Sequence, residues 1–595
     1  MNRITSIAIL LLLIPAFCFS QYTDYIGGGH ANGITITASS GANAIKTIDG
    51  DGLTAKRVEA ARFLAQAGFG GDMDDVDEII AVGFETWMDN QEALTASNYL
   101  LELEDIWTII YDAQINYGLT DDEIFGPNHP HFSYTWFEHL MTEDDQFRQK
   151  VSFVLSQIFV ISINSDLRDW PYALASYYDI FQNYGLGNYE DLLLEISLHP
   201  AMGYYLSHFE NPKSDPGNNI HPDENYAREI MQLFSIGLYE LNLNGTYKLD
   251  SNGDKIPTYD NNDIKELAKV FTGLGAGGIQ DWVDWTNDQP VWNLGIYATD
   301  RTVPMMMYDD EHEQGPKELF GGTYTIPAGQ SGMEDVEEAI NQIYLHDNVG
   351  PFLAKRLIQR LIKSNPSPEY IARAASVFNN NGQGERGDMF AFIKAILLDV
   401  EARTCDAMEL NNPGRLREPV MRLTSLLKAF PLDNIGDNFW EAGVQQMNHM
   451  GQQPLASPTV FNFYLPDYQP IGDIGDADLV APEFQIFNTQ TSIGYINKVN
   501  DWTNWDYILY DWEDDDIVGE NGVSLSNAHL ETTIQNDGIE KFLNDIDIIL
   551  GLGQLTDDTR DVIRQAAIDL NWSDLADALL MVYILMISPD YTIQK

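Results

Sequence analysis

Most of the chain carries apolar residues at the three- and four-residue spacing of amphipathic helices. The first two such segments run over 57–68 and 75–90, and a glycine-rich stretch separates them. Further helices are predicted over 95–117, 132–142, 144–163, 171–183, 187–198, 200–209, 223–240, 262–272, 334–345, 349–362, 367–379, 387–399, 416–429, 538–550, 557–569 and 573–587. No run of strands alternates with these helices, so neither a Rossmann sheet nor a TIM barrel is indicated.

Strand patterns are few and short, and they predict hairpins on a helical body at 247–249, 256–258 and 323–325. Two stretches, 274–330 and 465–535, are rich in Gly, Trp, Pro, Asp or Asn and lack periodicity. We expect them to be long loop excursions that cover a site. The predicted fold class is therefore mostly α: one large multi-helix domain over 55–595, with a few short β-hairpins and long irregular loops.

The first twenty residues have the pattern of a secretory signal peptide. Arg3 supplies the positive start, an apolar run extends from Ile7 to Ile14, and Ser20 offers a small residue at the expected cleavage point. An N-terminal anchor is the alternative, but the apolar run is too short to span a bilayer well. We expect residues 1–20 to be removed, 21–54 to form a flexible extension, and the protein to be exported to the periplasm or beyond, with no transmembrane segment in the mature chain.

The charge balance is strongly acidic, with 33 basic against 90 acidic residues and a net charge of −57. Such a surface repels nucleic acid and anionic membranes, so neither is an expected partner. Acidity of this kind keeps an exported protein in solution, and it also allows a divalent cation as a cofactor. If Cys18 leaves with the signal peptide, Cys405 is the one cysteine left, and no internal disulfide can form.

The polar string from His221 to Glu229 is the most informative candidate site. On a helix of about 100° per residue, Glu224, Asn225, Arg228 and Glu229 fall on one side. An arginine between carboxylates holds one of them ionised and leaves another free to shift its pKa. These four residues are candidate catalytic groups, with His221 as a candidate binding residue. The alternative is a solvated polar face with one weak salt bridge.

A second constellation places Asp191, Glu195 and His199 on one helical stripe. Glu195 and His199, four residues apart, could present two metal ligands or a carboxylate that orients an imidazole. Glu195 and His199 are therefore candidate binding residues, and His199 is also a candidate metal ligand. The favoured alternative is a histidine that ends a helix before Pro200.

A third candidate site is the dense charge run from Asp309 to Lys317. It makes His312 a candidate metal ligand and Lys317 a candidate binding residue near carboxylates, although a solvated loop is the commoner structure for such a run. The stretch that begins at Asp250 resembles the start of a calcium loop, but Asn261 stands where that loop needs Glu. We therefore expect a hairpin turn there.

The chain resembles a widespread bacterial family catalogued as a domain of unknown function, number eighteen hundred. The most specific match is the string Asp223-Glu224-Asn225-Tyr226-Ala227-Arg228-Glu229. Further matching positions lie at 60–70, 154–159, 198–202, 271–273, 312, 315, 317, 417–419 and 458–464. Relatives often carry a Trp-His-Asn motif where Ser156 and Gln157 stand, and His-Asp where His312 and Glu313 stand.

The resemblance implies export and a mostly helical fold, without an established activity. It also implies a functional partner among exported sulfatase-like proteins. The leading hypothesis is a hydrolase acting on an envelope or environmental polymer such as a polysaccharide. Glycosidases need two carboxyl groups across the substrate. Glu224 and Glu229 are offset by about 140° on a helix, so a second carboxylate would have to come from elsewhere.

Two other hypotheses stay open at the level of sequence. One is a non-catalytic binding or assembly protein of the envelope, in which the same residues stabilise a helical core. The other is a metal-dependent enzyme that uses His199, His312 and carboxylates. A pocket lined by Glu224, Arg228, Glu229 and His199 would favour an enzyme, whereas mutual satisfaction without a cavity would favour a binding protein.

Overall fold

The computed structural model describes most of the chain after the expected signal peptide and extension. The described residues are 55–280, 289–403, 414–443, 449–504, 507–570 and 573–594. The predicted signal peptide, the predicted extension at 21–54 and Cys405 lie outside them.

Helices make up the N-terminal part nearly as the periodicity predicts. They are α3 (Ala55–Ala67), α4 (Met73–Val82), α5 (Phe84–Glu92), α6 (Tyr99–Tyr117), η1 (Asp121–Glu123), α7 (His129–Thr142), α8 (Gln146–Ser156), η2 (Asp166–Asp169), α9 (Pro171–Tyr184), α10 (Tyr189–Leu198), α11 (Pro200–Tyr205), α12 (Asn225–Glu229) and η3 (Ile230–Ser235). The helix predicted over 75–90 is split, because Gly83 has a φ of 83° and ends α4. The helix predicted over 144–163 ends early, at Ser156.

The second half is also helical. Its helices are α13 (Asn261–Val270), η4 (Asp309–Glu311), α14 (Gly332–Leu345), α15 (Val349–Leu361), α16 (Pro368–Asn379), α17 (Met389–Leu398), α18 (Val400–Arg403), α19 (Pro419–Ala429), α20 (Asp473–Asp476), η7 (Pro482–Gln485), α21 (Thr489–Asn504), α22 (Asp515–Val518), α23 (Asn527–Ile549), α24 (Asp557–Leu570), α25 (Asp574–Ile587) and α26 (Pro589–Thr592). A mostly α fold is thus confirmed.

The strands form short antiparallel pairs. β1 (Leu274–Gly275) pairs with β2 (Met306–Met307), β3 (Lys317–Leu319) with β4 (Tyr324–Ile326), β5 (Arg415–Leu416) with β8 (Ile593–Gln594), and β6 (Leu432–Asn434) with β7 (Val523–Leu525). The predicted strand at 323–325 corresponds to β4. The predicted strands at 247–249 and 256–258 join single bridges between Leu241 and Tyr247, Leu249 and Lys255, and Tyr239 and Pro257. We call this segment, residues 239–257, the bridged hairpin.

The stretch 465–535 differs from the loop predicted for it. It contains α20, η7, the sixteen-residue α21, α22, β7 and the start of α23. Only Tyr495, Lys498, Val499, Trp502 and Thr503 of α21 are buried, and the rest of that helix is largely Thr, Gln, Asn and Asp. The apolar positions are too sparse for the helical period to stand out in the sequence.

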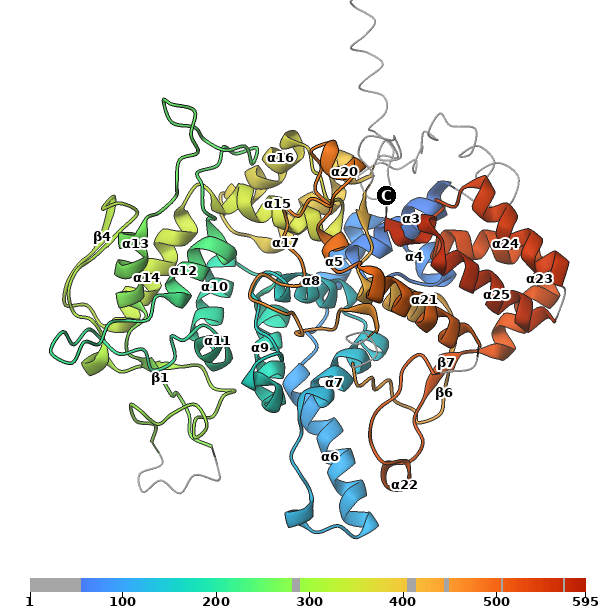
Figure 1. Cartoon of the computed structure of the whole chain (residues 1–595), viewed down its shortest axis with the longest axis horizontal. Coiled ribbons are helices and arrows are strands. Elements are labelled where there is room, and N and C mark those ends of the chain that lie inside the picture. Colours follow the sequence, from blue (N-terminus) through green and yellow to red (C-terminus); the bar gives the residue numbers. More distant parts are fainter. Residues whose placement is uncertain are drawn as a thin grey trace, which may run out of the picture.

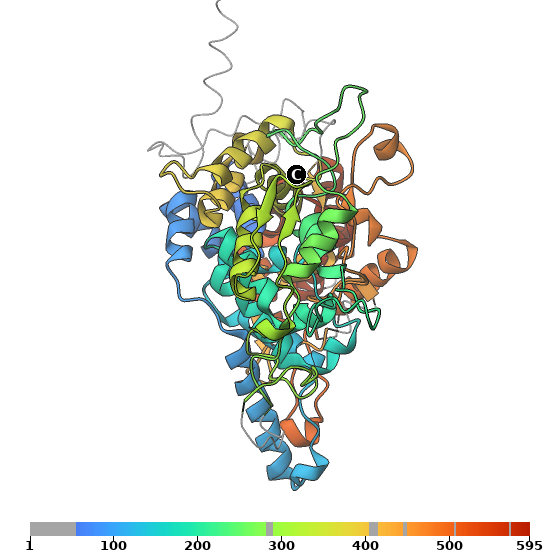
Figure 2. The same cartoon turned by 90° about the vertical axis from the view of Figure 1, so that its left-hand side faces the viewer.

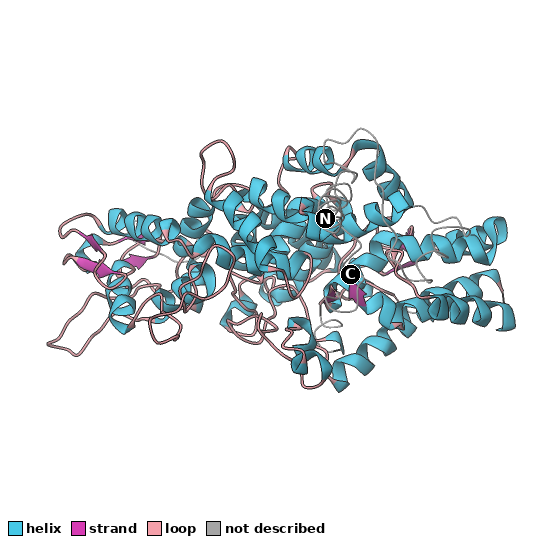
Figure 3. Ribbon diagram, turned by 90° about the horizontal axis from the view of Figure 1, so that it is seen from above, coloured by secondary structure: helices cyan, strands magenta, loops and turns pink. Residues whose placement is uncertain are grey.

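The molecule is an elongated helical body (Figure 1). One large apolar core runs through it, and a second, small cluster consists of Ile106, Ile110, Tyr134, Trp440 and Ala442. Helices α23, α24 and α25 pack together at one end, while α13 and α14 lie with β3 and β4 at the other (Figures 1 and 3). Helix α6 projects from the body next to α7 (Figure 2). Within the described ranges, no helix combines the length and the apolar character that crossing a membrane requires.

Candidate functional site

The polar string of the sequence forms a short α-helix that continues directly as a π-helix. Helix α12 ends at Glu229, and in η3 the Ile236 amide donates to the Met231 carbonyl five residues back, at 3.0 Å. A single regular helix over 223–240 was the prediction, and it is wrong after residue 229. Single π-helical turns occur frequently at functional sites, which directs attention to the residues that η3 presents.

Three of the four candidate catalytic residues lie at the surface. Arg228 Nη2 is 3.5 Å from Glu224 Oε2, with 41% and 38% of the two side chains exposed. Asn225 is exposed and donates its amide to Asp223, and His221 is also exposed. An exposed ion pair of this kind contributes at most about 1 kcal/mol. The structure therefore places these residues on the solvated face that the alternative interpretation described.

Glu229 differs from its neighbours because it points inward. Its side chain is buried, and its Oε2 has no hydrogen-bond partner among the described residues. Burial raises the pKa of Glu229, and the charge of Arg228 opposes that shift. The Tyr259 hydroxyl is also unpartnered; burial and the nearby Glu229 charge raise the pKa of Tyr259 to about 12. The charges of the two groups influence each other, but no hydrogen bond joins them.

His199 is a structural cap. It precedes α11, where its Nδ1 accepts the Ala201 amide at 3.2 Å and its Nε2 lies 3.1 Å from Ser176 Oγ. Burial lowers the pKa of His199 to about 3, so the ring is neutral and does not act as a cation at the end of α10. Glu195 is half-buried one turn earlier; burial raises its pKa, and a hydrogen bond with Tyr184 opposes the shift.

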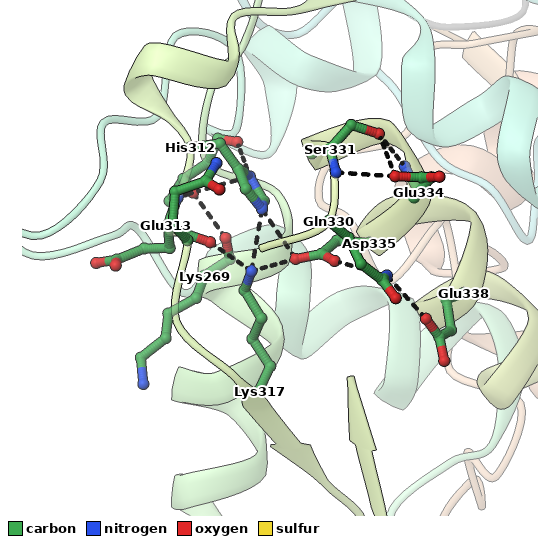
Figure 4. A network of polar contacts seen from close by, with 12 residues as sticks. Lys269, His312, Glu313, Lys317, Gln330, Ser331, Glu334, Asp335 and Glu338 are labelled. Carbon is green, nitrogen blue, oxygen red and sulfur yellow. Dashed lines mark hydrogen bonds and ion pairs between the residues drawn. The ribbon is translucent and has the colours of Figure 1, made fainter. Parts of the chain in front are cut away.

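His312 and Lys317 belong to a buried network between η4, β3 and the start of α14 (Figure 4). His312 Nε2 is 3.0 Å from Asp335 Oδ2 and 3.0 Å from Lys317 Nζ, and Lys317 Nζ also contacts Asp335 directly. His312 Nδ1 faces the Thr272 carbonyl at 2.8 Å. The three side chains are at most 2% exposed, so neither His312 nor Lys317 meets solvent as a binding residue would.

A cavity that the sequence did not indicate lies beside η3. It has a volume of about 420 Å³ and is enclosed by η3, α15, the bridged hairpin and the segment 460–467. Lys255, Lys355, Arg356 and Arg360 line it, and Asp467 is the one carboxylate among its described lining residues. We call it the basic cavity. Four of the chain's 33 basic residues thus converge on one concave site in a protein of net charge −57.

Three of the cavity's cations have no ion-pair partner among the described residues. Arg356 stacks over the Phe352 ring at 5.0 Å, and Lys255 lies over the Tyr247 ring at 3.7 Å. Lys355 and Arg356 are half-buried; burial first and the neighbouring cation second lower the pKa of both, that of Arg356 to about 10. The charge of Asp467 opposes both shifts. Arg356 therefore carries positive charge at neutral pH, and the cavity has more cations than carboxylates.

The fourth cation, Arg360, is held by Gln157 and Tyr464, which together with Glu418 we call the cavity floor. Arg360 Nη1 donates to Tyr464 Oη at 2.9 Å and to Gln157 Oε1, and Gln157 Nε2 donates to Glu418 Oε2 at 2.7 Å. Gln157, Glu418 and Tyr464 lie in three of the stretches that carry the family resemblance, and Gln157 directly follows the end of α8. Residues far apart in the sequence therefore hold one guanidinium rigidly beneath the cavity.

Only part of this site had a sequence signal. Lys355, Arg356, Arg360 and Lys363 fall within nine residues of an otherwise acidic chain, and residues 352, 356 and 360 share one face of α15. Lys255 lines the same cavity because the bridged hairpin folds against α15. The sequence around Lys255 does not indicate this contact.

No group of three or more metal-binding side chains comes together within the described part of the chain. In both His199 and His312, each ring nitrogen lies against a polar group of the protein.

Comparison with known proteins shows which family the chain belongs to. A family model described as "Protein of unknown function (DUF1800)" matches residues 62–593. No curated protein matches the chain, and no solved structure does. The match spans nearly all of the described fold, including η3, α15 and the segments that build the basic cavity. The chain therefore belongs to the DUF1800 family of proteins of unknown function.

Proposed function

We propose that this protein is an exported binding protein for anionic groups of an envelope or environmental polymer, and that the basic cavity holds such a group. The observation that carries the proposal is the set of unpaired cations, Lys255, Lys355 and Arg356, in one cavity. Lys355 and Arg356 are half-buried, and half-buried cations without partners cost stability. A bound carboxylate, sulfate or phosphate ester would supply the missing charge. Export follows from the predicted signal peptide and is part of the proposal.

Aromatic side chains around the cavity support a sugar as the carrier of the charge. Tyr239, Tyr247 and Phe461 line the cavity and are 37%, 44% and 43% exposed. Exposed aromatic rings stack on the apolar faces of sugar rings, and Tyr hydroxyls add polar contacts. An anionic polysaccharide satisfies both features at once, with the charged group inside and the ring on the rim. A sulfated polymer would also suit the expected sulfatase-like partner.

Hydrolysis of the polymer, the leading hypothesis from the sequence, has less support than binding. Glycoside cleavage requires two carboxyl groups placed across the scissile bond. Asp467 is the one carboxylate among the described residues that line the cavity, and neither Glu224 nor Glu229 lines it. Below the cavity, Arg360 is held by Gln157 and Tyr464 through its terminal nitrogens.

Calorimetric titration of the purified chain with dextran sulfate, polygalacturonate and uncharged dextran tests the proposal. We expect binding of the two anionic polymers and none of dextran. The acidic protein surface repels polyanions, so affinity that survives this repulsion must come from a local site. Binding of dextran with equal affinity, or no binding of either polyanion, would contradict the proposal.

Two lysine variants of equal charge separate the cavity from general electrostatics. Lys355→Gln removes a cavity cation, whereas Lys265→Gln removes an exposed cation of α13 outside the cavity. We expect at least a several-fold loss of polyanion affinity for the first variant and little change for the second. Equal losses would assign binding to overall charge and not to the basic cavity.

A further inference from the structure

We propose that Lys317 and Asp335 condense to an intramolecular isopeptide bond in the folded protein, and that His312 transfers the proton this reaction needs. The inference is independent of the proposed binding function, because these residues lie outside the basic cavity. It rests on the arrangement of an amine, a carboxyl group, an imidazole and an amide donor in one buried network (Figure 4).

The reacting groups are already in contact. Lys317 Nζ lies directly against Asp335 Oδ2, and His312 Nε2 is 3.0 Å from each of these atoms. Asp335 Oδ1, the other carboxyl oxygen, accepts a hydrogen bond from Gln330 Nε2 at 3.0 Å. The side chains of Lys317 and Asp335 are 1% and 2% exposed, so water is kept from the pair. Effective concentrations between groups held in this way are very high.

The hydrogen bonds assign a role to each neighbour. The Thr272 carbonyl accepts from His312 Nδ1 at 2.8 Å, which leaves the lone pair of Nε2 facing the amine. His312 can therefore take a proton from the Lys317 ammonium and pass it to Asp335 Oδ2. Gln330 donates to the oxygen that becomes negative when the amine adds to the carboxyl carbon, as an oxyanion donor does.

The reaction balances without any further reagent. The neutral amine of Lys317 attacks Asp335 Cγ and forms the C–N bond, and the extra electron pair moves to Oδ1. The C–Oδ2 bond then breaks, Oδ2 leaves as water after receiving protons that the amine has lost, and the carbonyl re-forms. An ammonium and a carboxylate are thereby converted to one amide and one water molecule, with no oxidant or reductant.

No other lysine in the described part of the chain has this combination of neighbours. Lys363 pairs with Glu401 at 3.1 Å, but no histidine contacts that pair. Lys150 is buried and contacts Met421 and a carbonyl, without a carboxylate. The bond would join β3 to the first turn of α14. The chain has two cysteines, one of them in the predicted signal peptide, so its mature form would have no internal disulfide. The isopeptide bond would provide a covalent cross-link instead.

Peptide mapping of the denatured wild-type protein tests the proposal. Trypsin cleaves after lysine, and the sequence predicts separate fragments 302–317 and 318–355. If the bond forms, Lys317 resists cleavage, and one fragment spanning 302–355 appears, lighter than its sequence mass by one water molecule. Cleavage after Lys363 in the same digest is the internal control. Separate fragments 302–317 and 318–355 at their full sequence masses would overturn the proposal and leave a buried ion pair.

Two variants distinguish condensation from resistance to trypsin. In Asp335→Asn the amine displaces ammonia, so the joined fragment should be lighter than its sequence mass by ammonia. In His312→Gln, with native circular dichroism, we expect both separate fragments at full mass. A cross-link that forms unchanged in His312→Gln would overturn the role given to His312. A joined Asp335→Asn fragment that is lighter by water instead of ammonia would overturn the assignment of residue 335 as the reacting group.

Discussion

Replacement of Arg356 by glutamine isolates the electrostatic contribution of the basic cavity. At about 4 Å and an effective dielectric of about 20, one guanidinium attracts one anion by roughly 4 kcal/mol before desolvation is counted. Arg356 is half-buried, so part of this is screened, and hydrogen bonds to charged groups contribute about 1.5–3 kcal/mol net. The expected loss is therefore roughly 10- to 100-fold in affinity for an anionic oligosaccharide.

The stability of the Arg356→Gln variant, unlike its affinity, is expected to change little. Arg356 has a cation–π contact with Phe352 but no ion-pair partner among the described residues, and burial and Arg360 lower its pKa. A base whose pKa is lowered by folding destabilises the folded state while it is charged. The cation–π contact with Phe352 stabilises that state and offsets this cost. Replacement of Arg356 should therefore change the unfolding free energy by less than about 1 kcal/mol.

Calorimetric titration and thermal unfolding of wild type and Arg356→Gln check both expectations. Unchanged affinity together with a large fall in melting temperature would refute the reasoning, since Arg356 would then be a structural residue.

Three further outcomes are expected. His199→Ala should cost about 1 kcal/mol of stability in thermal unfolding, as loss of a helix cap does, with no change in anion affinity or metal content; His199→Asn should retain most of it. Glu229→Gln should be more stable than wild type at neutral pH and similar at acid pH in chemical denaturation. Burial raises the pKa of Glu229 above its ordinary 4.5, so its favourable contribution is present below that value and is lost as pH rises through the folded pKa; a less stable variant at neutral pH would contradict this. Polyanion binding by the wild type should weaken steeply with added salt, and insensitivity to salt would contradict an electrostatic cavity.

Periodicity predicted most helices because an amphipathic helix must bury one face. Periodicity failed where glycine conformation or tertiary packing determined the helix boundaries. Gly83 splits one predicted helix, since its positive φ ends α4. Helix α21 was missed because few of its residues are apolar, and tertiary packing holds it in place. The change from α12 to a π-helix at Ile230 has no sequence signal that periodicity can detect.

The candidate site was predictable only where its members are neighbours in sequence. Spacing correctly set Glu224 beside Arg228, yet it could not show that both face solvent. His312 and Lys317 were singled out as polar groups in a charged run, but Asp335 joins them from a helix that follows a hairpin. The cations of the basic cavity come from α15 and the bridged hairpin, and only the folded chain brings them together.

Several of the stretches that carry the family resemblance lie next to each other beneath the basic cavity. Three of its stretches meet around Arg360 through Gln157, Glu418 and Tyr464, and a fourth leads through α12 into η3. The Gln157 side-chain amide accepts a hydrogen bond from Arg360 and donates one to Glu418. The shared stretches thus form a scaffold that fixes one cation while three others stay unpaired.

A crystal structure of the purified chain soaked with glucose 6-sulfate, compared with one soaked with glucose, tests the central claim most directly. We predict that the sulfate lies in the basic cavity within hydrogen-bonding distance of Arg356 and at least one of Lys355 and Lys255, with the sugar ring against Tyr239 or Tyr247, and that glucose does not bind there. A sulfate bound elsewhere, or no sulfate in the basic cavity, would contradict the account.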